Sequence, residues 1–162
     1  MAQEGIEVHD GGCLCGRVRY RTRGAPRFMA VCHCRYCQKV TGSAANTEVA
    51  FLKEDVQFSG DLRTYEYRSP AHGRLMRSHF CAECGVTVGL SFERFAAVQA
   101  ILAGTYDDPG WIRFDKHIFT QQALPWMAYS DAMDVYGGHC LGADGAPVKP
   151  DRPRSAAAAA AG

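Results

Sequence analysis

The stretch Cys32-His33-Cys34-Arg35-Tyr36-Cys37 places three thiols and an imidazole within six residues. Packing alone does not require such a density of thiols, whereas coordination of a soft metal ion does. Zn²⁺ is bound by cysteine and histidine side chains in both structural and catalytic sites. The stretch therefore predicts a zinc-centred site, and we expect the rest of the chain to be arranged around it.

The remaining cysteines form two tight pairs and one isolated residue. Cys13-Leu14-Cys15 precedes the central stretch, Cys81-Ala82-Glu83-Cys84 follows it, and Cys140 stands alone. Such pairs are typical of metal binding in a reducing compartment, whereas secreted disulfide frameworks are usually shorter chains with cysteines spread along them. A C-x-x-C-G segment between two strands is typical of a zinc knuckle, because glycine permits the tight reversal of the chain.

The seven clustered cysteines are enough for two zinc ions with different coordination. Structural zinc takes four protein ligands, whereas catalytic zinc keeps one position for water or substrate. In one partition, a closed site forms from Cys13, Cys15, Cys81 and Cys84, and a second, open site forms from Cys32, Cys34 and Cys37. A zinc ribbon fits the spacing as well, and it would combine Cys34 and Cys37 with Cys81 and Cys84.

Composition and charge limit the classes of protein to which the chain can belong. With 162 residues, of which 47% are hydrophobic and 22% charged, the chain can bury a core without crosslinks. Lysine and arginine total 18 against 17 acidic residues, so no strong field attracts nucleic acid or an anionic membrane surface. There is no leader pattern and no apolar run near the roughly 18 residues of a membrane span. We expect a cytoplasmic protein without nucleic-acid or membrane partners.

Alternation of apolar and polar residues predicts a mainly β chain. Strands are expected at residues 17–21, 28–31, 44–51, 56–58, 62–68, 74–80, 86–92 and 97–102. Residues 35–41 have room for one or two helical turns with Gly42 as the C-terminal cap. That helix would place Cys37 at its start, where free amides stabilise a thiolate.

The expected domain organisation is simple. Residues 1–10 are expected to be a loose N-terminus and residues 11–144 a single zinc domain. Residues 145–162, which end in a run of alanines, are expected to be a disordered tail rich in proline and alanine.

Motifs around the cysteines carry a resemblance to a known family. They are Gly12–Val18, Cys32–Lys39 with Gly42, Phe80–Gly85, Gly104-Thr105, His117–Phe119 and Pro125-Trp126. From about residue 11 to residue 136 the chain resembles the glutathione-dependent formaldehyde-activating enzyme (GFA) family of the Mss4-like superfamily, in its broad branch. Three spaced cysteine motifs in the same order make the resemblance specific.

The resemblance implies a β-tent fold of antiparallel sheets with short helical turns and two zinc ions. By position, it implies that Cys13, Cys15, Cys81 and Cys84 hold the structural zinc, and that the catalytic ligands of the second zinc are Cys32, Cys34 and Cys37. The implied activity is that of a carbon–sulfur lyase, in which glutathione or a similar thiol and formaldehyde or a similar small aldehyde condense to S-hydroxymethylglutathione or its analogue. Because a zinc ion with three thiolates is electron-rich, we favour capture of the thiol over polarisation of the carbonyl.

Several neighbouring side chains have alternative interpretations. His33 departs from the best-known members, which carry a small residue there, and we expect its ring to bond to backbone rather than zinc. Arg35 and Lys39 can hold a glutathione carboxylate or simply form an exposed helix face. His117 is expected to be half-buried and satisfied. If His33 or a distant ligand completes the second site, the protein is instead a non-catalytic zinc-stabilised binding module or thiol carrier.

Overall fold

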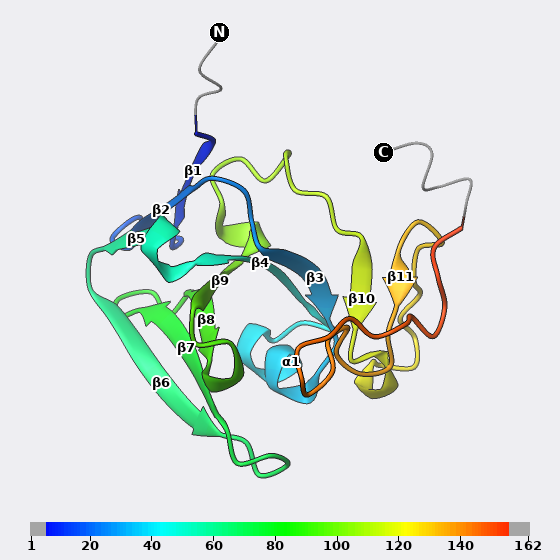
Figure 1. Ribbon diagram of the computed structural model, residues 1–162. Helices are drawn as coiled ribbons and strands as arrows, with labels where there is room; N and C mark the ends of the chain where they lie inside the picture. Colours follow the sequence, from blue (N-terminus) through cyan, green and yellow to red (C-terminus); the bar gives the residue numbers. More distant parts are fainter. Residues whose placement is uncertain (1–5, 156–162) are drawn as a thin grey trace, which may run out of the picture. The chain divides into compact units, whose positions relative to one another are not determined.

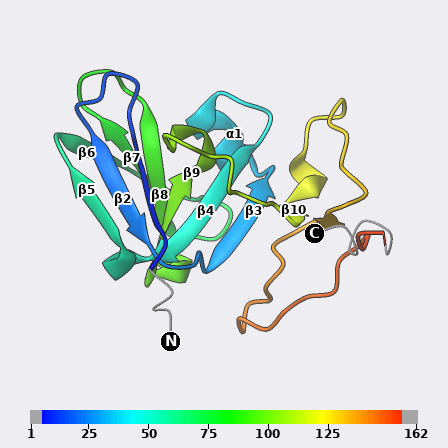
Figure 2. The same ribbon diagram turned by 90° about the horizontal axis from the view of Figure 1, so that it is seen from above.

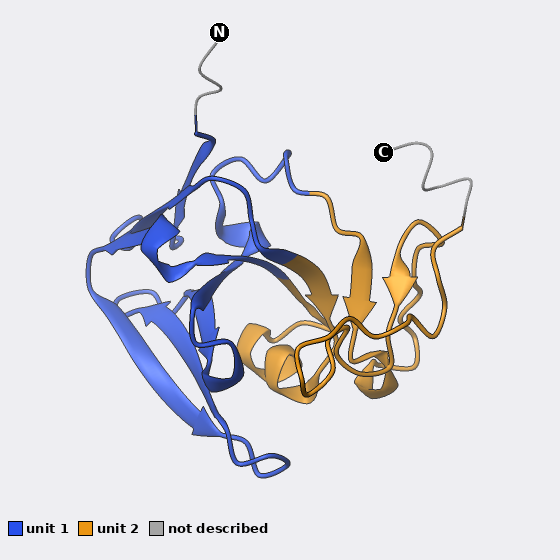
Figure 3. Cartoon of the chain, viewed as in Figure 1, with its two compact units in different colours: residues 1–28, 48–112 blue, residues 29–47, 113–162 orange. Residues whose placement is uncertain are grey.

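A computed structural model describes residues 6–155 of the chain. The chain divides into two compact units, unit 1 with residues 1–28 and 48–112 and unit 2 with residues 29–47 and 113–162 (Figure 3). Strands are the main regular structure, and the described residues contain one α-helix (Figure 1). This confirms the predicted mainly β class with short helical turns, while the boundaries of a single domain over residues 11–144 stay a prediction.

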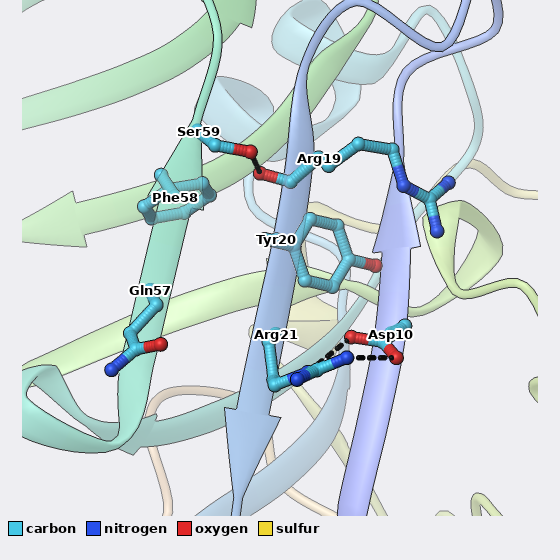
Figure 4. A pocket seen from close by; sticks show the side chains of 7 residues that line it. All are labelled: Asp10, Arg19, Tyr20, Arg21, Gln57, Phe58 and Ser59. Carbon is cyan, nitrogen blue, oxygen red and sulfur yellow. Dashed lines mark hydrogen bonds and ion pairs between the residues drawn. The ribbon is translucent and has the colours of Figure 1, made fainter.

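One sheet of unit 1 has three antiparallel strands in the order β1 (Val8–Gly12), β2 (Arg19–Arg23) and β5 (Val56–Ser59). Side chains alternate along β2, because Tyr20 and Thr22 are buried while Arg21 between them and Arg23 after them are exposed. Figure 4 shows Arg21 reaching across to Asp10 on β1, where its Nε donates to Oδ1 at 2.7 Å. Arg19 pairs with Asp107 in the same way. Arg19 and Arg21 on this face of the sheet are therefore exposed to solvent and paired with carboxylates, as the alternation of the sequence predicts.

The other strands of unit 1 form an antiparallel sheet around the core. Their order is β4 (Asn46–Leu52, of which residues 48–52 belong to this unit), β9 (Val98–Leu102), β8 (Thr87–Phe92), β7 (Leu75–Cys81) and β6 (Leu62–Arg68), and β7, β8 and β9 lie side by side in both views (Figure 1, Figure 2). Val49, Phe51, Val88, Leu90 and Ile101 are fully buried. Their burial supplies the hydrophobic stabilisation of the unit.

Unit 2 is built on short parallel pairings. β10 (Lys116–Ile118) pairs with β3 (Phe28–Cys32) on one side and with β11 (Asp134–Val135) on the other. The helix α1 (Arg35–Thr41) ends at Gly42, whose φ of 64° is left-handed, which confirms the predicted helix and cap. Single 3₁₀ turns occur in both units, at η1 (Lys53–Asp55), η2 (Glu93–Phe95), η3 (Ala103–Thr105) and η4 (Thr120–Gln122).

Two segments expected to be loose or disordered make backbone hydrogen bonds where the structure describes them. Residues 8–10 are not loose, because they pair with β2 as part of β1. Residues 145–155 are hydrogen-bonded rather than disordered, for the amide of Val148 donates to Cys140 O at 2.8 Å and that of Asp151 donates to Val135 O at 2.9 Å. Both segments are held by backbone hydrogen bonds, which leave little trace in side-chain patterns. The rest of these predictions, for residues 1–5 and 156–162, lies outside the described residues.

The turn between β5 and β6 brings the backbone of Gly60 against that of Arg17 and Val18. Gly60 has a φ of +91°, and a Cβ on it would lie 1.9 Å from the carbonyl oxygen of Arg17. We expect Gly60→Ala to lower the free energy of unfolding by about 3 kcal/mol or more, because a left-handed backbone and a steric clash act together. Chemical denaturation measures this effect.

Gly73→Ala is the matched control for that substitution. Gly73 has a φ of +70°, but its Cβ would meet nothing within 4 Å. The control is expected to lose only about 1 kcal/mol, from backbone strain. Equal losses in the two variants would contradict the steric argument.

Candidate metal centres

The first centre lies in unit 1 and consists of Cys13, Cys15, Cys81 and Cys84, which we call the four-cysteine cluster. Its four Sγ atoms all lie within 4.8 Å of one another. The Cys13 and Cys15 sulfurs are 3.5 Å apart, and those of Cys15 and Cys81 are 3.7 Å apart. Since Zn–S bonds are about 2.3 Å long, sulfurs at the corners of a tetrahedron lie about 3.8 Å apart. The donor set therefore fits a tetrahedrally coordinated zinc ion.

Two turns with similar hydrogen bonding bring these thiols together. After β1, the amide of Cys13 donates to Val18 O at 3.0 Å, and after β7 the amide of Cys81 donates to Val86 O at 3.0 Å. Each turn contains a glycine with left-handed φ, 76° at Gly16 and 72° at Gly85. Glycine adopts this conformation without a Cβ penalty. The short reversals allow both members of each cysteine pair to reach one point.

Hydrogen bonds shift the pKa values of Cys13 and Cys15 in opposite directions. Burial raises the pKa of Cys13, but hydrogen bonds from the Val18 amide and the neighbouring thiols outweigh this effect and lower the pKa to about 6. The Val18 amide lies 3.2 Å from the Cys13 sulfur. The amide of Arg17 lowers the pKa of Cys15, but hydrogen bonds with the other thiols outweigh it and raise the value to about 12. Amide donors thus favour thiolate within the cluster, and a metal ion would displace the shared protons.

The second centre lies in unit 2 and consists of Cys32, Cys34 and Cys37, which we call the three-cysteine cluster. Its Sγ atoms also lie within 4.8 Å of one another. Cys32 is the last residue of β3, and Cys37 lies in the first turn of α1. Both are buried, whereas Cys34 is half-buried. The predicted partition into a group of four and a group of three is thus the grouping seen in the structure, and either group can hold a metal ion.

Cys34 is the residue that caps the helix. Its sulfur accepts a hydrogen bond from the Cys37 amide at 3.4 Å, so the thiol that a helix amide stabilises is Cys34, while Cys37 lies in the first turn as expected. Hydrogen bonds from the Cys32 and Cys37 thiols and from the amides of Cys37 and Tyr36 lower the pKa of Cys34 to about 3, against the opposing effect of burial. These hydrogen bonds therefore favour the thiolate form of Cys34.

Polar side chains that the sequence analysis did not single out surround this cluster. Asn46 Nδ2 lies 3.9 Å from the Cys37 sulfur. The buried Gln38 donates through Nε2 to His33 O at 2.6 Å and to Gln122 O at 2.9 Å. The amide of Arg35 in turn donates to Gln122 Oε1 at 2.9 Å. In the sequence Gln38, Asn46 and Gln122 look like ordinary surface amides, and only their tertiary contacts show that they hydrogen-bond around this cluster.

The expected backbone partner for the His33 ring is wrong. His33 Nε2 lies 2.9 Å from Nδ1 of His117, and the ring is not part of either metal-ligand group. His117 is buried rather than half-buried. The Arg35 guanidinium hydrogen-bonds to the Gln38 side chain, and Lys39 is exposed. The possible glutathione contacts of Arg35 and Lys39 stay predictions.

Comparisons with known proteins give one family assignment. A search of curated proteins found no significant match. One solved structure, a Rhodobacter sphaeroides protein, is 14% identical and aligns over 78% of this chain and 97% of its own, with a TM-score of 0.47. Among the described residues, no helix is both long and apolar enough to cross a membrane. The family model of the glutathione-dependent formaldehyde-activating enzyme matches residues 8–122, which include both cysteine clusters, and this chain therefore belongs to that family.

Proposed function

We propose that this protein is a zinc-dependent carbon–sulfur lyase of the GFA type, which adds a glutathione-like thiol to a small, formaldehyde-like aldehyde. The observation that supports this most strongly is the difference between the two clusters, since one offers four sulfurs and the other three. Structural zinc sites use four protein ligands, whereas catalytic sites use three and leave one position for substrate. The four-cysteine cluster is accordingly proposed as the structural site and the three-cysteine cluster as the catalytic one.

The chain's own residues prepare the three-cysteine cluster for both metal and substrate. Hydrogen bonds from Cys32 and Cys37 lower the pKa of Cys34, which favours the thiolate form that ligates a metal ion. Cys34 is the most exposed of the three residues, and we propose that small molecules approach the cluster from its side. A zinc ion held by the three thiolates would supply a Lewis acid that lowers the pKa of an incoming thiol.

The reaction that follows is an addition. The substrate thiol releases its proton to water, and its sulfur attacks the aldehyde carbon and forms the carbon–sulfur bond. The carbonyl electron pair moves onto oxygen, which takes up a proton from water, so that no proton is gained or lost overall. The part of the protein is to hold the thiol where the aldehyde meets it, since proximity converts a bimolecular encounter into an oriented one. Three negatively charged sulfurs make thiol capture a more suitable role for the site than carbonyl polarisation.

The proposal extends to the setting of the protein. Reduced thiols are kept in the cytoplasm, where free cysteines in clusters are stable and glutathione is abundant. We place the protein there, as one domain with two zinc ions and with small-molecule partners only.

A condensation assay with metal counting tests the proposed function. In the presence of formaldehyde and glutathione, the wild-type rate is expected to exceed the uncatalysed background, and Cys34→Ser is expected to lower the enzymatic part by at least about 100-fold. Native mass spectrometry is expected to find two zinc ions in the wild type and one in this variant. Cys140→Ser is the matched control, because Cys140 is a buried cysteine outside both metal-ligand groups.

The two readouts separate the enzyme from its alternative. If Cys34→Ser loses one zinc ion while wild type and variant show the same rate, the lyase activity has no support. The three-cysteine cluster would then serve a non-catalytic zinc module.

A further inference from the structure

His33 and His117 form a buried pair beside the three-cysteine cluster. Their nearest ring nitrogens, Nε2 of His33 and Nδ1 of His117, are 2.9 Å apart. His33 has no exposed surface, and its Nδ1 is a buried atom without a hydrogen-bond partner. The ring of Tyr129 packs against both histidines, with centroid distances of 5.4 Å to His33 and 5.0 Å to His117. The pair is thus enclosed by side chains rather than by solvent.

The unpartnered Nδ1 determines which nitrogen carries the proton. If His117 Nδ1 were the donor, the single proton of neutral His33 would sit on Nδ1, leaving a buried N–H without an acceptor. Buried donors without partners are rarer in proteins than buried acceptors without partners, and each costs about 1–3 kcal/mol. The favoured arrangement therefore has His33 Nε2–H donating to His117 Nδ1.

His33 lies between two of the three cysteines, so its position sets theirs. The amide of His33 donates to Ile118 O at 3.0 Å, and its carbonyl accepts from Gln38 at 2.6 Å. The ring bond to His117 is the third attachment. Rotation of the backbone at His33 would move the Cys32 and Cys34 sulfurs, and these three attachments oppose it.

His117 is itself well placed to act as a support. It belongs to β10, where it pairs with Val31 of β3 on one side and with Val135 of β11 on the other. Its carbonyl also accepts from the Tyr136 amide at 2.9 Å. A side chain on a strand held from both sides is a rigid platform for orienting a neighbouring site.

We propose that His117 is a positioning residue for the three-cysteine cluster, because it accepts the Nε2–H of His33 and so holds the segment between Cys32 and Cys34 in its metal-ready conformation. The inference rests on the proposed metal site at this cluster, and it does not depend on the condensation reaction. Hydrogen-bonding residues that orient the surroundings of a metal typically change its affinity by about 10–100-fold.

Cobalt binding tests the inference, in protein that carries zinc at the four-cysteine cluster and no metal at the three-cysteine cluster. Co²⁺ titrated into the three-cysteine cluster is followed by its thiolate charge-transfer absorption. His117→Phe keeps a ring but offers no acceptor, and it is expected to weaken Co²⁺ binding by about 10–100-fold. His117→Asn is expected to restore most of the affinity, because its side-chain oxygen can accept where Nδ1 does.

His79→Phe is the matched control. His79 lies in unit 1, and both of its ring nitrogens are hydrogen-bonded at 2.9 Å, Nδ1 to Thr64 and Nε2 to Ser91. Its replacement is expected to leave Co²⁺ affinity at the three-cysteine cluster unchanged. Equal weakening in both phenylalanine variants would indicate general destabilisation and would overturn the inference, as would unchanged affinity in His117→Phe.

A measurement on the wild-type protein does not depend on any variant folding. ¹⁵N NMR of the histidine rings is expected to show the His33 proton on Nε2 and the His117 proton also on Nε2. A proton on His33 Nδ1, or a wild-type protein that takes up no Co²⁺ at this cluster, would overturn the inference. If Co²⁺ binds as expected and the protein does not catalyse condensation, only the proposed function fails.

Discussion

Replacing Cys15 by serine is expected to remove the metal ion of the four-cysteine cluster and to lower the free energy of unfolding by about 4 kcal/mol or more. Cys15 is exposed, in contrast to the buried Cys13 and Cys81. The substitution therefore disturbs little packing, and the loss of stability reports on metal coordination. Denaturant unfolding in a zinc-buffered solution, combined with metal analysis, measures both effects.

Leu14→Ala is the control from the same turn. Leu14 lies between the two cysteines of the pair and is 89% exposed, so truncating it removes neither a ligand nor core packing. The control is expected to keep its metal and to change stability by less than about 0.5 kcal/mol. A Cys15→Ser protein that keeps both its metal content and its stability would contradict a structural role for this cluster.

The two metal ions are expected to leave the protein in separate steps during titration with a chelator. The ion of the three-cysteine cluster should be lost first, because three protein ligands hold a metal less firmly than four. Condensation activity should disappear in that step while circular dichroism stays unchanged. Unit 1 should unfold only in the second step, when the four-cysteine cluster is emptied.

Stepwise loss is checked by following metal release, activity and circular dichroism in one titration. The Cys34→Ser protein is the control, since it should show the second step alone. Addition of zinc after the first step should restore activity. Simultaneous loss of activity and structure at one chelator concentration would show that the clusters do not have the separate roles proposed here.

Local features were the ones that the sequence predicted well. The strand at residues 62–68 and the helix ending before Gly42 were recognised because alternation and a capping glycine act within a few residues. The grouping of the cysteines followed from ligand arithmetic, helped by the family resemblance. Spacing alone left the ribbon partition open, and the family resemblance decided which cysteines are grouped together.

Features that depend on distant partners were not predictable in the same way. β1 and residues 145–155 are held by backbone hydrogen bonds, which carry no side-chain pattern. His33 and His117 are 84 residues apart, so their contact follows from strand pairing and not from local sequence. In the sequence Gln38 looks like a solvated helix residue, because the carbonyls of His33 and Gln122 to which it donates are brought to it only by the fold.

The separation of the two cysteine pairs along the chain has a consequence for metal affinity. Cys15 and Cys81 are 66 residues apart, and joining ends this distant costs a flexible chain about 4 kcal/mol of entropy. A metal ion that held both pairs in the unfolded chain would have to offset this cost, whereas in the folded chain β1 and β7 already bring the two pairs together. A metal ion at this cluster is thus expected to bind more tightly to the folded chain than to the unfolded one, and to stabilise unit 1 by that difference.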